Sequence, residues 1–246
     1  MRAIILSAGK SSRFFGDMPD YLRPPHKSLC PMGENECILW RQKNALASVG
    51  CHNIEIVYSG DNLSWKHWLD NMHLSENITL IENHDAERFG SYKSIYAGIS
   101  EFDKDDGTII LEGDIWIDNI AFFIEDFNKM MDYPYKLHVL AYKNPISKTG
   151  VYLTQNPFNH HPSYYYDLEH KGNVPINSVE SCQIWYIPKQ MWNSFKLSQK
   201  GKDLNGINWQ AFNDFPINIV QATRNNYLNI NSQGDLDVIR KRLNSR

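Results

Sequence analysis

The chain has 246 residues, a formal net charge of −3 and an apolar fraction of 42%. This composition supplies the core of one large domain and excludes a disordered chain. The near-neutral charge argues against a nucleic-acid-binding protein, and no apolar run is long enough to insert into a membrane. The four cysteines lack C-x-x-C spacing, which predicts free thiols in the reducing cytoplasm instead of a metal site.

The first half of the chain alternates short apolar runs with amphipathic stretches. The apolar runs predict buried strands at 3–6, 53–58, 78–82 and 108–111. The stretches between them predict helices at 37–49, 65–72 and 91–102. This alternation is typical of an α/β protein with a doubly wound, mostly parallel sheet.

The second half is less regular, and we expect it to belong to the same single domain, 1–246. Its predicted helices and strands are 120–131, 135–142, 183–187, 191–197, 218–222 and 234–243. The segment 143–180 is rich in Pro, Asn, His and Tyr and contains short strand candidates at 151–154 and 164–168. We interpret this segment as a β-rich flap over the acceptor side of a site.

The loop that follows the first strand is suited to binding phosphate. Its side chains are mostly small, and its sequence is Ser7-Ala8-Gly9-Lys10-Ser11-Ser12-Arg13. Small side chains allow the backbone to approach a ligand and point its N–H groups at it. Lys10 and Arg13, followed by Arg23 and Lys27, add positive charge, so the region could hold a polyphosphate. The alternative is an ordinary strand-to-helix turn with surface cations.

An acidic residue follows the fourth strand. Asp114 stands in the segment Glu112-Gly113-Asp114, and its carboxylate could bind Mg²⁺ that bridges the oxygens of a nucleoside triphosphate. The alternative is an Asp that caps a turn. Ligands bind at the carboxyl ends of parallel strands, where both this residue and the first loop fall, so we favour the metal role. Glu112 is a weaker candidate, placed on the same side by strand alternation.

The segment 6–13, together with Pro25-His26-Lys27-Ser28-Leu29, resembles the signature L-A-A-G-x-G-x-R … P-K-x-L of nucleotidyltransferases. Ser11 stands where the family usually has a second glycine. His26 is inserted between Pro and Lys, as in the branch that contains bacterial phosphocholine cytidylyltransferases. The resemblance implies a Rossmann-like nucleotidyltransferase fold. The nucleotide-binding residues that it implies are Leu6, Ser7, Ala8, Gly9, Lys10, Ser11, Ser12, Arg13, Arg23, Ser94 and Glu112.

A late segment resembles the family's second metal-binding motif, D-I-D-x-x-x-D-L, but departs from it. Asn229 and Asn231 replace its first two acids. An amide oxygen is a weaker ligand for a hard cation than a carboxylate. We expect Asn231 to join Asp114 as a Mg²⁺ ligand, and the departure leaves open a protein with weak or no turnover. Asp235 is expected to be an N-terminal charge of the last helix.

The resemblance implies a Mg²⁺-dependent cytidylyltransferase that joins CMP from CTP to a small phosphorylated acceptor, such as phosphocholine, a phosphonate or a phosphorylated amino acid derivative. Catalysis would need alignment and charge neutralisation, with Arg13 on the leaving phosphates and Lys27 on the α-phosphate and the acceptor phosphate. The run 92–96 resembles the branch's nucleobase segment, in which Ser94 contacts the base or caps a helix.

The acceptor pocket is the least determined part of the site. Glu180 could meet an amine, and Trp185 could form part of an aromatic cage for a quaternary ammonium group. The alternative for the aromatic residues is a place in the core. Two other functions remain open: a nucleotidylyltransferase for sugar 1-phosphates, and a nucleotide-binding protein without turnover. Nothing in the sequence excludes a homodimer.

Overall fold

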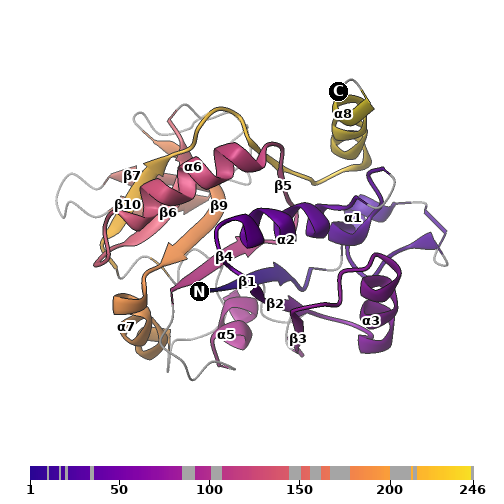
Figure 1. Cartoon of the computed structure of the whole chain (residues 1–246), viewed down its shortest axis with the longest axis horizontal. Helices are drawn as coiled ribbons and strands as arrows, with labels where there is room; N and C mark the ends of the chain where they lie inside the picture. The colour runs from indigo at the N-terminus through magenta and orange to yellow at the C-terminus, as the bar shows by residue number, and fades with distance from the viewer. Residues whose placement is uncertain are drawn as a thin grey trace.

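A mostly parallel sheet with helices on both faces forms the centre of the protein (Figure 1). The computed structural model describes residues 1–9, 11–16, 18–19, 22–33, 36–84, 92–100, 107–143, 151–155, 162–166, 178–199, 212 and 215–244. The strand order is β10-β6-β9-β4-β1-β2-β3. These strands are β1 (Arg2–Ser7), β2 (Asn53–Tyr58), β3 (Ile78–Glu82), β4 (Thr108–Glu112), β6 (Leu137–Tyr142), β9 (Val179–Ile187) and β10 (Ile217–Gln221).

The strand directions confirm the predicted fold class. β1 runs parallel to β2 and β4, β2 parallel to β3, and β10 parallel to β6, whereas β9 is antiparallel to β4 and β6. The carboxyl ends of all the parallel strands therefore lie at one edge of the sheet. In an open α/β sheet this edge is where ligands bind.

The alternation of side chains along β1 places one apolar layer on each face. Ala3 and Ile5 pack in a cluster with α2 and α6, and Ile4 and Leu6 pack in a second cluster with α5 and α7. Figure 1 shows α2 and α6 on one face of the sheet and α5 and α7 on the other. The helices are α1 (Ser12–Phe15), α2 (Ile38–Ser48), α3 (Asn62–Asn71), α5 (Tyr92–Ser100), α6 (Ile120–Met131), α7 (Lys189–Gln199) and α8 (Gln233–Asn244), with a short 3-10 helix, η2 (Lys27–Leu29).

Two smaller pairings extend the sheet architecture. β7 (Val151–Gln155) and β8 (Pro162–Tyr166) form an antiparallel hairpin, and β7 also pairs with the start of β9. Both strands overlap the two candidates expected in the flap, 151–154 and 164–168. The rest of 144–177 lies outside the described residues, and a cover over the site stays a prediction. β5 (Ile115–Ile117) pairs with β11 (Tyr227–Asn229) in a separate two-stranded sheet that the sequence did not predict.

The described helices include none with the length and apolar character needed to cross a bilayer. Cys30, Cys37, Cys51 and Cys182 are buried free thiols.

Glu55 on β2 is a buried carboxyl group, and its Oε2 atom has no hydrogen-bond partner among the described residues. Burial raises the pKa of Glu55 to about 7, although Arg2 opposes the shift. Because the folded-state pKa lies above the unfolded value, the carboxyl group destabilises the fold increasingly as the pH rises from about 4.5 through about 7. Glu55→Gln should therefore raise the free energy of unfolding at pH 8 by roughly 1–2 kcal/mol, after allowance for solvent screening.

Urea unfolding at pH 5 and pH 8 measures this effect. We expect a clear gain from Glu55→Gln at pH 8 and a smaller one at pH 5. Glu76→Gln, at an exposed carboxyl group, is the matched control and should show no such difference. Equal stability of Glu55→Gln and the unsubstituted protein at pH 8 would contradict the prediction.

Candidate active site

A tight turn at the carboxyl end of β4 carries Asp114 beside the end of β1. Gly113 N donates a 2.9 Å hydrogen bond to Leu6 O. A Cβ atom on Gly113 would lie 2.9 Å from the same oxygen and would collide with the Ser7 hydroxyl. The glycine therefore allows the turn to approach β1 closely, and it places Asp114 next to the signature loop (7–13).

Lys27 and Asp114 form an ion pair at this edge of the sheet. Lys27 Nζ lies 2.8 Å from Asp114 Oδ2, and the side chains are only 12% and 20% exposed. Asp114 Oδ1 is buried and has no hydrogen-bond partner in the part of the chain that the structure describes. The arrangement combines one cation with a carboxylate oxygen that can accept a further positive ligand.

His26 fixes the backbone at Lys27. Its Nδ1 accepts a hydrogen bond from Ser28 N at 3.1 Å, which caps η2, and its ring stacks on Trp65. Burial, and to a lesser degree the charge of Lys27, lower the pKa of His26 to about 3. The imidazole is therefore neutral between pH 5 and pH 8, and Lys27 is the cation of this segment.

Ser11 joins the signature loop to Lys27. Its φ of +52° lies in the left-handed region, where glycine is favoured and where the family signature has glycine. The hydroxyl compensates for this strain in part, because Ser11 Oγ accepts a hydrogen bond from Lys27 N at 3.3 Å. A glycine would adopt this positive φ without strain, but it would lack the hydroxyl that accepts the hydrogen bond from Lys27 N.

Asn231 reaches the same turn from the other end of the chain. β11 pairs with β5, and one residue further Ile230 N donates to Asp114 O at 2.9 Å. Asn231 follows directly and is exposed. Asp235 Oδ2 accepts hydrogen bonds from Asn231 N and Ser232 N, so it caps α8, as predicted from its position.

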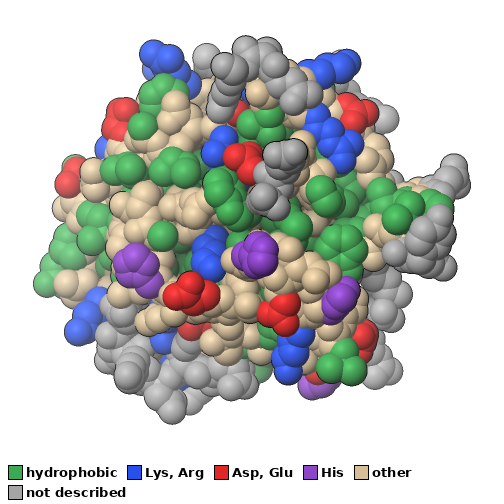
Figure 2. Space-filling model, turned by 45° about the vertical axis from the view of Figure 1, so that its right-hand side comes forward, with side chains coloured by type: hydrophobic (Ala, Val, Ile, Leu, Met, Phe, Trp, Pro, Cys, Tyr) green, Lys and Arg blue, Asp and Glu red, His purple; other side chains and the backbone are tan. Residues whose placement is uncertain are grey.

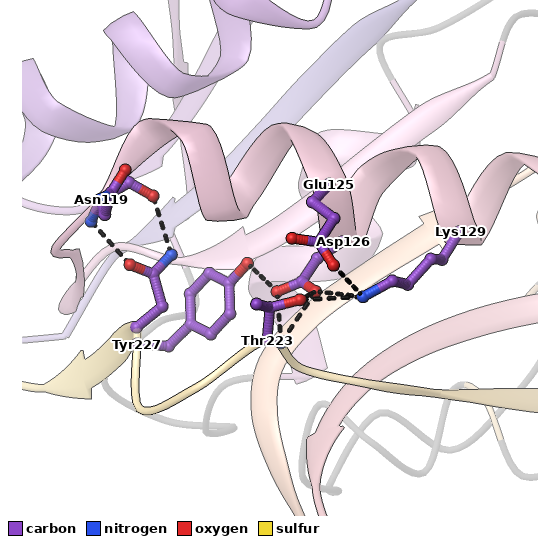
Figure 3. Close-up of polar contacts among 7 residues, drawn as sticks. Asn119, Glu125, Asp126, Lys129, Thr223 and Tyr227 are labelled. Atoms are coloured by element: carbon purple, nitrogen blue, oxygen red, sulfur yellow. Dashed lines mark hydrogen bonds and ion pairs between the residues drawn. The ribbon is translucent and has the colours of Figure 1, made fainter.

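The segment that carries Asn231 is fastened to α6 by a buried carboxylate (Figure 3). Asp126 accepts hydrogen bonds from Thr223 N, Thr223 Oγ1 and the Tyr227 hydroxyl, and it pairs with Lys129. At the start of the same helix, Asn226 exchanges hydrogen bonds with the backbone of Asn119. Figure 3 shows Asp126, Thr223 and Tyr227 converging beneath the helix.

Asp126→Ala should lower the free energy of unfolding by about 3 kcal/mol, because it leaves the buried Tyr227 hydroxyl and the half-buried Thr223 donors without their acceptor. Glu125→Ala is the matched control on the same helix. Glu125 is 52% exposed and also pairs with Lys129, but solvent screens that contact. Urea unfolding should separate a large loss at Asp126 from almost none at Glu125, and equal losses would show that this network does not fasten the segment.

The oxygen atoms at the turn fit a hard divalent cation that takes its remaining ligands from water and substrate phosphate. The described residues contain no group of three or more His, Cys, Asp or Glu side chains that could hold a metal ion. Asp114 Oδ1, which is buried and has no partner among the described residues, is a suitable oxygen ligand. Asn231 directly follows Ile230, whose N–H donates to Asp114 O. Mg²⁺ commonly takes one or two protein oxygens and completes its shell with water and substrate phosphate.

The other predicted nucleotide-binding residues lie around this edge where they can be placed. Leu6, Ser7 and Ala8 are buried at the end of β1, and Gly9 is exposed. Lys10 lies outside the described residues, as do the side chains of Ser12 and Arg13, whose backbone is in α1. These loop assignments remain predictions.

Three further candidates have contacts that define their surroundings. Arg23 Nη2 donates to Gly16 O at 3.0 Å and so holds the loop region together. Ser94 is buried, and its hydroxyl accepts a hydrogen bond from Asn83 Nδ2, which favours a structural role over contact with a base. Glu112 pairs with Leu6 at the last register position between β4 and β1.

The two acceptor-side candidates differ in position. Glu180 lies at the start of β9, opposite Tyr142 at the end of β6, and hence at the edge formed by the carboxyl ends of the parallel strands. Trp185 lies near the end of β9, opposite Ile110 of β4, is 1% exposed and stacks on Phe212. Its ring belongs to the core, so the structure does not support Trp185 as an acceptor contact.

Gln42 was not singled out from the sequence, yet its amide contacts the backbone on both sides of Asp114. The available signal was its position on the apolar face of α2, with Leu39 and Leu46.

On the face shown in Figure 2, basic and acidic side chains are interspersed and do not form one basic surface.

Part of the chain matches the model of a known protein family. Residues 3–122 match the family described as the MobA-like NTP transferase domain, and this segment contains the signature loop, Lys27 and Asp114. The search of curated proteins gave no match.

Solved structures resemble nearly the whole chain. A Bacillus anthracis protein assigned as a glucose-1-phosphate thymidylyltransferase, in complex with sucrose, has a TM-score of 0.73 and 12% identity over 98% of this chain and 94% of its own. The inositol-1-phosphate CTP transferase of T. maritima has a TM-score of 0.70 and 13% identity over 98% and 95%. The CTP:phosphocholine cytidylyltransferase of Streptococcus pneumoniae has a TM-score of 0.67 and 13% identity over 98% and 98%.

These scores do not single out the phosphocholine branch, which stays a prediction. The protein has the α/β fold of the nucleotidyltransferases, and its residues 3–122 match the MobA-like NTP transferase domain.

Proposed function

We propose that this protein is a divalent-cation-dependent nucleotidyltransferase that joins CMP from CTP to a small phosphorylated acceptor and releases pyrophosphate. The observation that carries the proposal is the Lys27–Asp114 ion pair, at the carboxyl ends of the strands and beside the signature loop. CTP is supported by the resemblance of the Pro25-His26-Lys27 segment to the cytidylyltransferase branch, and two of the structural neighbours are named for their use of CTP.

The reaction needs no nucleophile from the protein. An oxygen of the acceptor phosphate attacks the α-phosphorus of CTP, the bond from that phosphorus to the bridging oxygen of the β-phosphate breaks, and pyrophosphate leaves with the electron pair. A bound Mg²⁺ would supply charge neutralisation for the phosphates, with Asp114 and Asn231 as its protein ligands.

The remaining roles belong to the cations and backbone of the chain. The small residues of the signature loop let backbone N–H groups approach the phosphates. Arg13 holds the leaving β- and γ-phosphates, and Lys27 holds the α-phosphate against the acceptor phosphate. Glu180 lies at the same edge of the sheet and would meet an amine of the acceptor.

A sugar 1-phosphate is the second candidate acceptor, because the Bacillus anthracis neighbour is named as a glucose-1-phosphate thymidylyltransferase. A nucleotide-binding protein without turnover is the third candidate function, because Asn229 and Asn231 stand where the family signature has acidic residues.

Pyrophosphate release with Mg²⁺ distinguishes these three functions. Four nucleoside triphosphates should be crossed with phosphorylated choline, amines, amino acids, phosphonates and sugars. Release with CTP and one non-sugar acceptor would support the proposal, and release only with a sugar 1-phosphate would favour the second candidate. Nucleotide binding without release across the whole panel would favour the third.

A further inference from the structure

A side chain of α2 bridges the turn that carries Asp114. Gln42 is fully buried, and its Nε2 atom donates one hydrogen bond to Glu112 O and one to Ile115 O, both at 2.9 Å. These two carbonyl groups flank Gly113 and Asp114. Both protons of the amide are therefore used to fix the width of the turn.

The turn is also held by two backbone contacts. Gly113 N donates to Leu6 O of β1, and Ile230 N donates to Asp114 O. Each of these contacts is made by backbone atoms at or next to the end of a strand. Gln42 is the side chain that joins both ends of the turn, so its contribution can be changed without changing the backbone sequence of the site.

The Gln42 side chain is polar, although packing on this face of α2 would require only an apolar side chain. Leu39 and Leu46 lie on the same face of α2 in the apolar cluster. Gln42 Oε1 is buried and has no hydrogen-bond partner among the described residues. An amide that leaves a buried acceptor unpaired incurs a desolvation cost, and its two donated bonds to the Asp114 turn are what it gains in return.

We infer that Gln42 is a positioning residue for Asp114: its amide sets where the carboxylate stands relative to Lys27, and so sets the affinity of the site for the cation–nucleotide complex. This inference rests on the proposed function and deepens it. Gln42 itself touches neither nucleotide nor cation; it acts through the backbone of 112–115.

Gln42→Met tests this role, since methionine has a similar length and no donor. Calorimetry should show binding of Mn²⁺–CTP weakened about 10-fold or more, and binding of CTP without metal changed less than 2-fold. Lys43→Met is the matched control: it removes a side-chain bond to the carbonyl of Leu74 from the neighbouring position of α2, and it should change neither affinity. A purely structural role would weaken both forms of CTP alike or lower only the melting temperature, and either result would overturn the inference.

Gln42→Glu adds a pH signature that packing alone would not produce. An ionised glutamate cannot donate to either carbonyl group, whereas a protonated one can donate to one of them, and burial favours the protonated form. Binding of Mn²⁺–CTP should be weak at pH 8.5 and largely restored at pH 6, relative to the unsubstituted protein at each pH. An equal defect at both pH values would count against the role.

A crystal structure of Gln42→Met supplies a readout that needs no ligand. The Asp114 carboxylate should move away from Lys27 Nζ, and an unchanged 2.8 Å pair would overturn the inference. Absence of turnover in the unsubstituted protein, with Mn²⁺–CTP binding still dependent on Gln42, would refute the proposed transferase activity but not this role.

Discussion

Asp114→Ala is expected to lower kcat/KM for nucleotidyl transfer by at least about 10³-fold, the scale of losing a main electrostatic element of a phosphate-binding site. Asp114 is the carboxylate that the Gly113 turn places beside β1, and its buried Oδ1, which has no partner among the described residues, is suited to a cation. Its removal also leaves Lys27 without its ion-pair partner. Initial rates over a range of Mg²⁺ and CTP concentrations measure the loss.

The control for this substitution is Asp118→Ala. Asp118 lies four residues further, just after β5, and accepts a hydrogen bond from Trp116 Nε1. It should change kcat/KM less than about 3-fold, a surface-type effect. Both variants should keep the circular dichroism spectrum of the unsubstituted protein. An Asp114→Ala enzyme that retains more than a tenth of its Mg²⁺-dependent rate would refute the metal assignment.

Lys27→Met is expected to lower kcat by about 10²–10³-fold, because a preorganised cation in a site shielded from water stabilises developing charge more than an exposed one. The Lys27 side chain is 12% exposed, and the backbone of Lys27 is fixed by the cap of His26 and the hydroxyl of Ser11. Lys27→Arg keeps the charge and should recover part of the rate.

Lys66→Met on α3 removes an exposed lysine and serves as the control, with kcat expected to stay unchanged. Because Lys27 and Asp114 contact each other, the combined variant should lose less than the product of the two single losses. Full additivity would show that the ion pair has no part in the reaction.

The sequence predicts the regular elements well where local patterns decide them. β2, β3 and α6 have the predicted bounds, since apolar runs and amphipathic periodicity end at polar or turn residues there. α3 begins at Asn62, three residues before the prediction, because the Asp61 side chain accepts a hydrogen bond from Ser64 N and caps the helix.

Elements that depend on distant partners were missed. β5 and β11 have three residues each, too few for a periodic pattern, and they form only by pairing with each other across more than 100 positions of the chain. The first residues of β9 were also not predicted, because Val179 and Glu180 become strand through their pairing with β7.

Some residues of the candidate site could also be predicted from the local sequence, and others could not. The signature loop, Lys27 and Asp114 stand out because their residue types follow buried strands. Trp185 did not separate from the core by composition alone, since a tryptophan in a cage and a tryptophan stacked on Phe212 have the same local sequence signal. Gln42 acts through two carbonyl groups some 70 positions away, a contact that only the fold reveals.

Phosphorus-31 NMR of the unsubstituted protein with CTP, Mg²⁺ and the phosphorylated acceptors tests nucleotidyl transfer most directly. We expect pyrophosphate and a product with a new P–O–P bond between the CMP moiety and one acceptor to accumulate in equal amounts, and neither to form with Asp114→Ala. Formation of nucleoside diphosphate and inorganic phosphate, with no new P–O–P product, would contradict it.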